Sequence, residues 1–348
     1  MIKELLDRNG GFVIFGAQVI AYGAYEAIKG LTGRKPDAFV VSNLDNNPKE
    51  IDGIVVKEID SIDKSALIIV GVTELVQKEV VPFLEQNGYK NIFVLNQHEE
   101  HNLMSAYYDS IGKFPCAESG RDVVVNDFAI YEVKNHRDKK LTGHPKLKSW
   151  EKDIQAGRAS ASEKIAEYVD NIGENISEKN HQYCEMTATY WVWKNTSHDW
   201  CGIEHYRRHL LVTPEMLDDD IDAILPLPYI CYPNEATQFL RFVNEDVLEL
   251  LIETLKVLHP NEFQSYYNII YGKYQYTYNL VCAKREVFND YCKWFFEITE
   301  YMEQHAEKVP EIKETRALSY VAEVLTNIYF MSKQDELVIR HVGKEIYI

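Results

Sequence analysis

Short apolar runs alternate with helical patterns over the first hundred residues of the chain. Runs bounded by glycine and polar turn residues predict strands, and the segments between them have the apolar spacing of helices. The predicted order is a strand at 11–16, a helix from about Val19, strands at 37–41 and 66–71, a helix at 79–87 and a strand at 91–95. Because strands joined through helices pair in parallel, this half predicts a small α/β domain.

The alternation stops over 97–121, which contains Gly112, Pro115 and Gly120. Glycine and proline in such a segment are typical of connections rather than of regular elements. A chain of 348 residues is also longer than a single hydrophobic core usually allows. We therefore expect a linker over 97–121 and two domains, at 1–115 and 122–348.

The second half resumes an α/β pattern with longer helical stripes. The predicted elements are a strand at 123–133, a helix capped by Ser177 and running to about Asn195, a strand at 200–203, a helix at 216–220 after Thr213-Pro-Glu, and a strand at 223–226. Two stripes at helical spacing predict core positions, namely Phe288, Cys292, Phe295, Thr299 and Met302, then Leu318, Val321, Leu325 and Ile328.

Charge excludes one class of function. The chain has 54 acidic and 37 basic residues, a formal net charge of −17. A general nucleic-acid binder needs a basic face to neutralise phosphates, so no nucleic-acid partner is expected. A phosphate-bearing ligand must instead meet a local basic cluster.

Cysteine usage and hydropathy predict the compartment. The six cysteines form no Cys-x-x-Cys pair and no zinc-like grouping, which is typical of a reduced, intracellular protein. The charged segment 1–8 lacks signal-peptide form, and no apolar run reaches the length of a membrane span. We expect a cytoplasmic protein. Peripheral contact with the inner face of the cell membrane stays an alternative, because an acceptor can be membrane-bound.

The loop after the first strand lies where a dinucleotide-binding fingerprint would lie. It reads Gly16-Ala-Gln18, so a side chain stands where the second glycine lets backbone approach a pyrophosphate. The second strand ends at Ser42 and Asn43 rather than at a clear ribose-binding acid, although Asp45 is near. A structural Rossmann-like module is therefore favoured over a cofactor-binding one. This half also loosely resembles nucleotide-binding-like domains found beside sugar-modifying enzymes.

The densest polar and aromatic constellation lies in the second half, over 173–209. Its last part places His205, Arg207 and Arg208 directly after a short strand. Ligands of open α/β sheets bind beyond the carboxyl ends of strands, and two arginines with a histidine there can bind an anion. The less specific alternative is a solvated charged face.

From about residue 127 to 330 the chain resembles a domain family of capsular and exopolysaccharide biosynthesis proteins, long listed as of unknown function and regarded as glycosyltransferases of GT-A-like fold. The matching segments are IQAG at 154–157, DNIGENIS at 170–177, NHQYCEMT at 180–187, YWVWKN at 190–195 and GIEHYRR at 202–208. Asn279 and Glu323 match the family pattern, whereas residues next to them depart from it. The resemblance implies an α/β protein with an N-terminal Rossmann-like parallel-sheet domain and a C-terminal GT-A-like glycosyltransferase domain.

The resemblance implies transfer of a hexose from a UDP-sugar to a lipid-linked or oligosaccharide acceptor, with galactose as the candidate hexose. Fixed cations stabilise a leaving diphosphate, and a carboxylate deprotonates an acceptor hydroxyl if the reaction inverts the anomeric centre. The candidate catalytic residues are Glu185, His205, Arg208 and Glu323, with Asp170 as a further possible base. The candidate donor-binding residues are Asn135, His136, Asp170, Asn175, Asn180, Tyr206, Arg207 and Asn279.

The sequence leaves open whether the transfer reaction depends on a metal ion. The Asp-x-Asp spacing within 218–222 precedes a strand rather than following one, so it predicts an acidic turn and no metal site. Mn²⁺ or Mg²⁺ accompanying the donor remains an alternative, with His205 as a supplementary ligand. Two other functions also stay open: a non-catalytic sugar- or nucleotide-binding component of a polysaccharide-synthesis complex, and an NAD-dependent sugar oxidoreductase or epimerase centred on the first domain.

Overall fold

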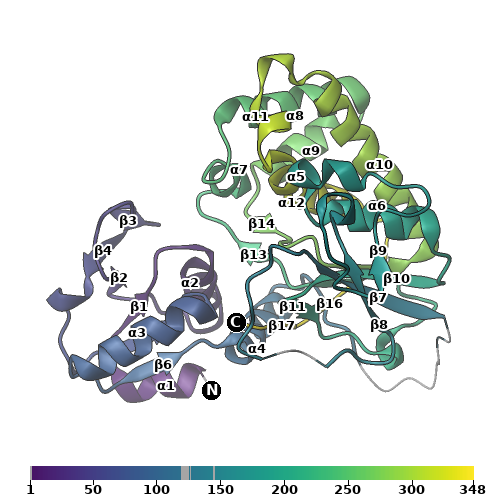
Figure 1. Ribbon diagram of the computed structural model, residues 1–348. Coiled ribbons are helices and arrows are strands. Elements are labelled where there is room, and N and C mark those ends of the chain that lie inside the picture. Colours follow the sequence, from purple (N-terminus) through teal and green to yellow (C-terminus); the bar gives the residue numbers. More distant parts are fainter. Residues whose placement is uncertain (1, 119–124, 126, 144–145) are drawn as a thin grey trace. The chain divides into compact units, whose positions relative to one another are not determined.

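The computed structural model describes residues 2–118, 125, 127–143 and 146–348. It divides into two compact units, of which the first comprises 1–115, 229–233 and 348 and the second comprises 116–228 and 234–347. Both units are α/β with largely parallel sheets, as the fold-class prediction requires (Figure 1).

The first unit is built on a sheet of order β3-β4-β2-β1-β5-β6, in which every pairing is parallel except that of β3 with β4. Its strands are β1 (Phe12–Phe15), β2 (Ala38–Val41), β3 (Glu50–Ile51), β4 (Ile54–Glu58), β5 (Leu67–Val70) and β6 (Ile92–Val94), and β13 (Tyr229–Ile230) also belongs to it. Its helices are α1 (Ile2–Asn9), α2 (Val19–Thr32), η1 (Ile59–Ser61), α3 (Glu74–Gln86) and α4 (Gln97–Ser110). Val80 and Leu84 of α3 pack on the sheet face that carries Val13, Val40 and Ile68.

The expected linker over 97–121 is wrong for most of its described length, because α4 occupies Gln97–Ser110. The Asn96 side chain caps this helix by accepting hydrogen bonds from the backbone N–H groups of His98 and Glu99, each at 3.0 Å. Leu103, Met104, Tyr107 and Tyr108 are buried along one side of α4, which gives the helix its packing energy. The glycine and proline that suggested a linker lie beyond its end.

The second unit is built on a larger sheet, of order β16-β12-β15-β10-β7-β8-β9, with β11 pairing both β10 and β17. Its strands are β7 (Phe128–Lys134), β8 (Glu151–Gln155), β9 (Tyr168–Val169), β10 (Trp200–His205), β11 (Arg208–Leu210), β12 (Ala223–Pro226), β14 (Tyr274–Gln275), β15 (Val281–Lys284), β16 (Ile339–Val342) and β17 (Lys344–Ile346). Strands β10, β7, β8 and β9 are mutually parallel, so their carboxyl ends meet at one edge.

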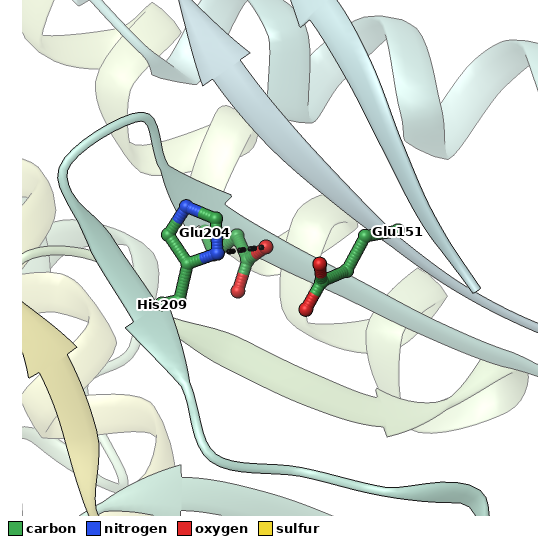
Figure 2. A group of neighbouring side chains, drawn as sticks. All are labelled: Glu151, Glu204 and His209. Carbon is green, nitrogen blue, oxygen red and sulfur yellow. Dashed lines mark ion pairs between the residues drawn. The ribbon is translucent and has the colours of Figure 1, made fainter. Parts of the chain in front are cut away.

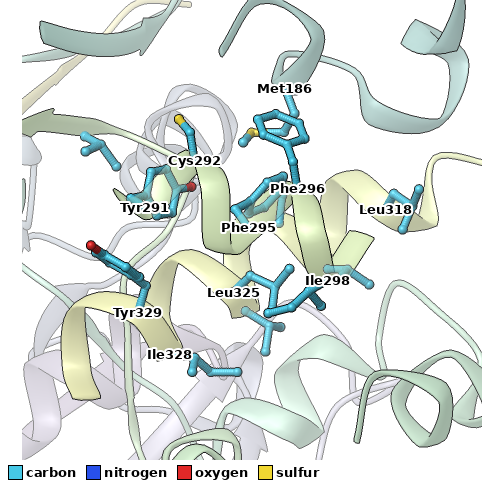
Figure 3. Packing of buried hydrophobic residues seen from close by; sticks show 14 of the residues in the cluster. Met186, Tyr291, Cys292, Phe295, Phe296, Ile298, Leu318, Leu325, Ile328 and Tyr329 are labelled. Carbon is cyan, nitrogen blue, oxygen red and sulfur yellow. The ribbon is translucent and has the colours of Figure 1, made fainter. Parts of the chain in front are cut away.

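Helices cover the larger sheet and supply most of the core. They are η2 (Arg158–Ser160), η3 (Ser177–Lys179), α5 (Asn180–Tyr183), α6 (Met186–Asn195), η4 (Pro214–Met216), α7 (Glu235–Phe239), α8 (Glu245–Leu258), α9 (Phe263–Ile270), α10 (Arg285–Gln304), η5 (Ala306–Lys308), α11 (Glu311–Glu314) and α12 (Ala317–Ser332). Both predicted stripes are fully buried, in α10 and α12, and Figure 3 shows part of their packing around Phe295 and Leu325. Burying one such side chain contributes about 1.5–3 kcal/mol.

One further prediction is tested only in part, and two others differ from the structure. The start of the strand expected at 123–133 lies outside the described residues, and β7 begins at Phe128. Residues 216–220 form no α-helix, because η4 ends at Met216 and Leu217 is extended and fully buried. The helix expected from Ser177 to Asn195 is interrupted at Cys184, whose φ of 46° and ψ of −123° are not helical.

Candidate functional site

A cavity of about 330 Å³ opens at the carboxyl ends of β7, β8 and β10 in the second unit. Asn135 follows β7, Ala156 follows β8, and His205 ends β10. The opposite wall comes from the segment around α5 and from Arg316 just before α12. This is the position in an open α/β sheet at which ligands bind. The lining consists of Val133, Lys134, Asn135, Arg137, Asp138, Ala156, Asn180, His181, Cys184, Glu185, His205 and Arg316.

Two of the candidate donor ligands from the sequence analysis, Asn135 and Asn180, line the cavity and are hydrogen-bonded to each other. Asn135 Nδ2 donates hydrogen bonds to the Ala156 carbonyl and to Asn180 Oδ1, each at 3.1 Å. Asn180 Nδ2 in turn donates to the Cys184 carbonyl at 2.7 Å. Gly157 has a φ of 66°, and a Cβ there would lie 2.4 Å from Asn180 Oδ1. The close approach of Asn180 therefore requires glycine at this turn.

Asp170 does not contact the cavity, which corrects its expected role as a donor ligand or base. Its side chain is fully buried, and it accepts hydrogen bonds from the Gly157 and Arg158 N–H groups at 2.7 and 2.9 Å. The Ser177 and Thr187 hydroxyls donate to the same carboxylate. Its acceptor capacity is thus used inside the protein, and Asp170 is a positioning residue that ties the Gly157 turn to α6. The Ser177 hydroxyl donates its hydrogen bond to this carboxylate and does not cap a helix.

Glu185 lines the cavity just after the break at Cys184 and is oriented from a second segment. Asn279 Nδ2 donates a hydrogen bond to Glu185 Oε1 at 3.0 Å, and Asn279 Oδ1 accepts one from Thr326 at 3.1 Å. Tyr278 and Asn279 have φ values of 70° and 53°, which non-glycine residues rarely adopt. Such backbone conformations gather at functional sites, and here they bring Asn279 to Glu185.

Glu323 forms an electrostatic pair with Glu185. Burial and the negative charge of Glu185 raise the pKa of the Glu323 carboxyl to about 7, and a backbone hydrogen bond from Tyr278 and the charges of Arg208 and Arg316 oppose the rise. A carboxyl with a raised pKa that is coupled to a nearby carboxylate is a recurrent acid–base arrangement. Glu323 itself does not line the cavity, so Glu185 is the member that faces a ligand.

The turn between β10 and β11 carries the predicted anion site. His205 pairs with Arg208 across this turn, and Tyr206 is buried with its N–H bonded to the Val133 carbonyl at 3.0 Å. Burial, with the charges of Arg208 and Arg207, lowers the pKa of His205 to about 3, so its imidazole is neutral at physiological pH. The Arg208 guanidinium lies 3.9 Å from the centre of the Tyr278 ring, which fixes its plane.

Four charged residues of the cavity were missed by the sequence analysis: Lys134, Arg137, Asp138 and Arg316. Burial raises the pKa of Asp138 to about 6, while Arg207 lowers it. Asp138 Oδ2 also accepts the Asn135 N–H at 2.7 Å. Asp138 lies only three positions beyond Asn135 in a polar stretch after a strand, which was a usable signal. Arg316 is distant in sequence from every motif, so no local pattern indicated it.

Of the predicted donor ligands only Asn135 and Asn180 line the cavity, and neither Arg207 nor Arg208 is part of its lining. Two of the remaining predicted ligands, His136 and Asn175, have surroundings that explain their absence. His136 is exposed, although its neighbours Asn135 and Arg137 line it. Asn175 makes local contacts, donating to the Gly173 carbonyl at 2.9 Å and accepting from the Ser177 N–H at 3.2 Å. Direct roles for both remain predictions that the geometry does not favour.

The acidic stretch Asp218 to Asp222 has structural partners. Asp222 Oδ2 accepts the Val338 N–H at 2.9 Å, and Asp222 Oδ1 pairs with Lys284 Nζ at 3.2 Å. Asp218 Oδ1 accepts the Asp220 N–H at 3.1 Å. The stretch leads into the amino end of β12, so it lies at the end of that strand where an α/β sheet does not bind ligands.

A second cavity of about 330 Å³ lies in the first unit, at the carboxyl ends of β1, β2 and β5. Gly16 and Gln18 line it after β1, and Ser42 and Asn43 line it after β2. Every residue of its lining is uncharged. Gly16 has a φ of 124°, and a Cβ there would lie 2.6 Å from the Gly71 carbonyl oxygen. This glycine is required by the close packing of β1 and β5.

Comparison with known proteins identifies a shared fold and the family of the chain. No curated protein matches it. A solved structure, the WbbM bifunctional glycosyltransferase in its apo form, superposes with a TM-score of 0.54 at 24% identity, covering 64% of this chain and 45% of that chain. This likeness establishes a shared fold, and the chain spans less than half of that protein's length. Among the described residues, no helix is long and apolar enough to cross a membrane. A family model matches residues 132–334, more than half of the 348 residues, so the chain belongs to the family described as a domain of unknown function, DUF4422.

Proposed function

We propose that the protein is a glycosyltransferase that transfers a hexose from a UDP-sugar to an oligosaccharide or lipid-linked acceptor in extracellular polysaccharide synthesis. The observation that carries the proposal is the cavity at the carboxyl ends of β7, β8 and β10, where Arg137, Arg316 and Glu185 converge. Glu323 lies outside its lining and is coupled to Glu185 electrostatically. The shared fold with the WbbM bifunctional glycosyltransferase supports the same class of chemistry.

The arginines serve the leaving group. When the bond between the anomeric carbon and the β-phosphate oxygen breaks, the nucleoside diphosphate gains negative charge. Preorganised cations directed at that charge lower the barrier more than they strengthen substrate binding. Arg208, held against Tyr278, and Arg207 are assigned to the diphosphate, and Arg316 adds positive charge from the opposite wall. Neutral His205 donates or accepts a hydrogen bond in the same place.

Glu185 is assigned as the general base. The acceptor hydroxyl oxygen attacks the anomeric carbon, its proton passes to the Glu185 carboxylate, and the electron pair of the broken bond leaves with the diphosphate. Asn279 orients the carboxylate through its 3.0 Å hydrogen bond. Glu323 is a positioning residue whose partial protonation limits the negative charge next to Glu185.

The remaining polar residues are assigned to the donor's other groups. Asn135 and Asn180 line the cavity with their side chains held by hydrogen bonds, which suits recognition of ribose or sugar hydroxyls. Among the described residues, no cavity carboxylate belongs to a group of three ligand-type atoms within reach of one ion. Mn²⁺ or Mg²⁺ accompanying the donor would therefore be held mainly by the donor phosphates.

A ligand panel tests the proposal. UDP, UDP-hexoses, other nucleoside diphosphate sugars and NAD are added separately to the full chain, and thermal unfolding is measured. A ligand at a hundredfold excess over its dissociation constant stabilises the native state by about 2.7 kcal/mol. We expect stabilisation by UDP and one UDP-hexose, followed by transfer of that hexose to a membrane-lipid extract. Stabilisation by NAD alone would favour an oxidoreductase, and binding without transfer to any acceptor would favour a non-catalytic component.

A further inference from the structure

A second polar cluster lies directly beneath the turn that carries His205 to Arg208. It consists of Glu132 on β7, Glu151 on β8, Glu204 on β10 and His209 on β11. Glu204 and His209 are the residues immediately before and after the turn, and Glu204 lies opposite Glu132 in the parallel ladder. Figure 2 shows Glu151, Glu204 and His209 directed toward one another. None of the four lines the cavity described above.

The cluster is closed to solvent and compact. The exposed fractions are 1% for Glu132, 6% for Glu151, 1% for Glu204 and 2% for His209. One ligand-type atom from each of Glu151, Glu204 and His209 lies within 4.8 Å of the other two. His209 Nδ1 is 3.3 Å from Glu204 Oε1, and its Nε2 is 2.8 Å from Glu132 Oε2.

Several buried atoms of the cluster have no well-aligned hydrogen bond to any described residue. They are Glu151 Oε1, Glu204 Oε1, His209 Nε2 and both carboxylate oxygens of Glu132. Lys148 and Lys134 form ion pairs with Glu151 and Glu132 at 3.2 and 2.8 Å, whereas among the described residues Glu204 Oε1 has an ion pair with His209 alone. Native proteins leave few buried polar groups unsatisfied, and such a group calls for a water or an ion as its partner.

We propose that Glu151, Glu204 and His209 bind a divalent first-row transition-metal ion, through one carboxylate oxygen each and His209 Nδ1. Ligands about 2.0–2.2 Å from a tetrahedral ion lie roughly 3.4 Å apart, close to the observed Nδ1–Oε1 separation. An imidazole with carboxylates selects Zn²⁺, Mn²⁺ or Fe²⁺ over Mg²⁺ and Ca²⁺, which favour oxygen ligands alone.

Glu132 completes the arrangement without binding the ion. A metal-bound histidine usually donates its other N–H to a carboxylate, which fixes the ring and its tautomer. Glu132 Oε2 lies 2.8 Å from His209 Nε2, on the side of the ring away from Glu204. When Nδ1 binds an ion, a small rotation of the imidazole would align His209 Nε2 to donate a hydrogen bond to Glu132 Oε2.

The ion is structural, and its effect on the proposed donor site is indirect. It joins three strands, β8, β10 and β11, at the base of the turn that bears Arg207 and Arg208. A fixed turn keeps these guanidinium groups where a diphosphate would meet them. The alternative occupant is a proton, since burial raises the pKa of Glu204 to about 8 in the cation-free protein.

Metal binding by the full chain tests the proposal without any sugar donor. The purified protein is stripped with a chelator and titrated by calorimetry with Zn²⁺, Mn²⁺ and Mg²⁺ in separate experiments, and Co²⁺ is added as a spectroscopic probe of nitrogen coordination. We expect saturation at about one Zn²⁺ or Mn²⁺ per chain, weaker binding of Mg²⁺, and a rise in the melting temperature on metal addition.

Glu204→Gln and His209→Gln should each weaken Zn²⁺ or Mn²⁺ binding by at least about a hundredfold, whereas Glu249→Gln on the exposed face of α8 should not. Glu151→Gln serves if either variant fails to fold. The proposal is overturned if the folded, stripped wild-type chain binds none of these ions saturably. It is also overturned if folded Glu204→Gln and His209→Gln bind as the wild type does, because the ion would then lie elsewhere and a proton would occupy the cluster.

Discussion

The two cavities described above have the same size and the same topological position but different linings. Each measures about 330 Å³ and opens at the carboxyl ends of parallel strands. The cavity of the first unit is lined without a charged residue, whereas that of the second unit gathers Lys134, Arg137, Asp138, Glu185 and Arg316. Sheet topology alone therefore provides a hollow, and function depends on the side chains placed around it.

The difference extends to the energetics of protonation. Around the cavity of the second unit, burial and neighbouring charges displace the pKa values of Asp138, His205 and Glu323 toward uncharged forms. Carboxylates and imidazoles of this kind cost stability and persist where chemistry needs them. Substitutions in and around the cavity of the second unit should therefore change binding and transfer, and their expected effects range from several orders of magnitude to none.

Arg208→Ala should have the largest effect. Removal of a preorganised charged donor from a developing oxyanion lowers kcat by about 10²–10³-fold, with little change in fold because the contact with Tyr278 is a partly exposed cation–π pair. Steady-state transfer measures the effect, and Arg241→Ala, at an exposed position on the same unit, is the control. Unchanged kcat/KM in both Arg207→Ala and Arg208→Ala would place the diphosphate elsewhere.

Gly157→Ala should reduce donor affinity by roughly tenfold, the equivalent of about one lost hydrogen bond. Its Cβ would lie 2.4 Å from Asn180 Oδ1 and would displace the side chain that Asn135 holds. Gly112→Ala is the matched control, because Gly112 has a φ of 65° and a Cβ there meets nothing within 4 Å. Equal donor dissociation constants for the two variants would show that Asn180 does not contribute to the site.

Glu323 should give the unfolding free energy a distinct pH dependence. Its pKa in the folded protein, about 7, exceeds the ordinary value of 4.5. The neutral carboxyl is thus favoured by folding, so this contribution is fully present below pH 4.5 and is lost as the pH rises through 7. Denaturant unfolding between pH 5 and 8 should show this loss for wild type and not for Glu323→Gln.

Glu185→Gln should reduce the same loss, because the Glu185 charge helps to raise the pKa of Glu323. Glu249→Gln, at an exposed position, should follow the wild-type curve. Parallel curves for wild type, Glu323→Gln and Glu185→Gln would show that the two carboxyls are not coupled.

Asp220→Asn should leave transfer and stability unchanged, since Asp220 is exposed. Asp222→Asn should leave transfer unchanged and lower stability by about 0–1 kcal/mol through its ion pair with Lys284. His205→Ala, by contrast, should lower transfer, because His205 lines the cavity of the second unit. Transfer assays with chelator and with added Mn²⁺ or Mg²⁺ complete the test. Inactive Asp220→Asn or Asp222→Asn with strict metal dependence would identify this stretch as the metal motif.

The periodic parts of the fold were predictable, and the exceptions have physical causes. Phe295 and Leu325 are buried as predicted because helical spacing reports directly on which face is apolar. Helix α4 was missed because its polar first turn resembles a loop until the cap at Asn96 is recognised. The break at Cys184 left no sequence signal, since a non-glycine residue adopts the positive φ there.

The candidate site was predictable where it is local in sequence. The segments around Asn135, Asn180 and His205 follow strand ends or motifs, and the structure gathers them at one cavity. Arg316 enters that cavity from a helix start far along the chain, which only the tertiary fold reveals. Asp170 was misassigned because a buried carboxylate that accepts backbone N–H groups has the same residue type as a ligand-binding one.

Hydrogen–deuterium exchange of the full chain with and without a UDP-hexose tests most directly which cavity binds the donor. Ligand contacts slow the exchange of the backbone amides they restrain. The account predicts added protection in peptides covering 133–138, 180–187 and 203–208, and none in peptides covering 15–20 and 41–47. Protection confined to the peptides of the first unit, with the second unit's cavity unaffected, would contradict the assignment of nucleotide-sugar binding to the cavity of Glu185 and His205.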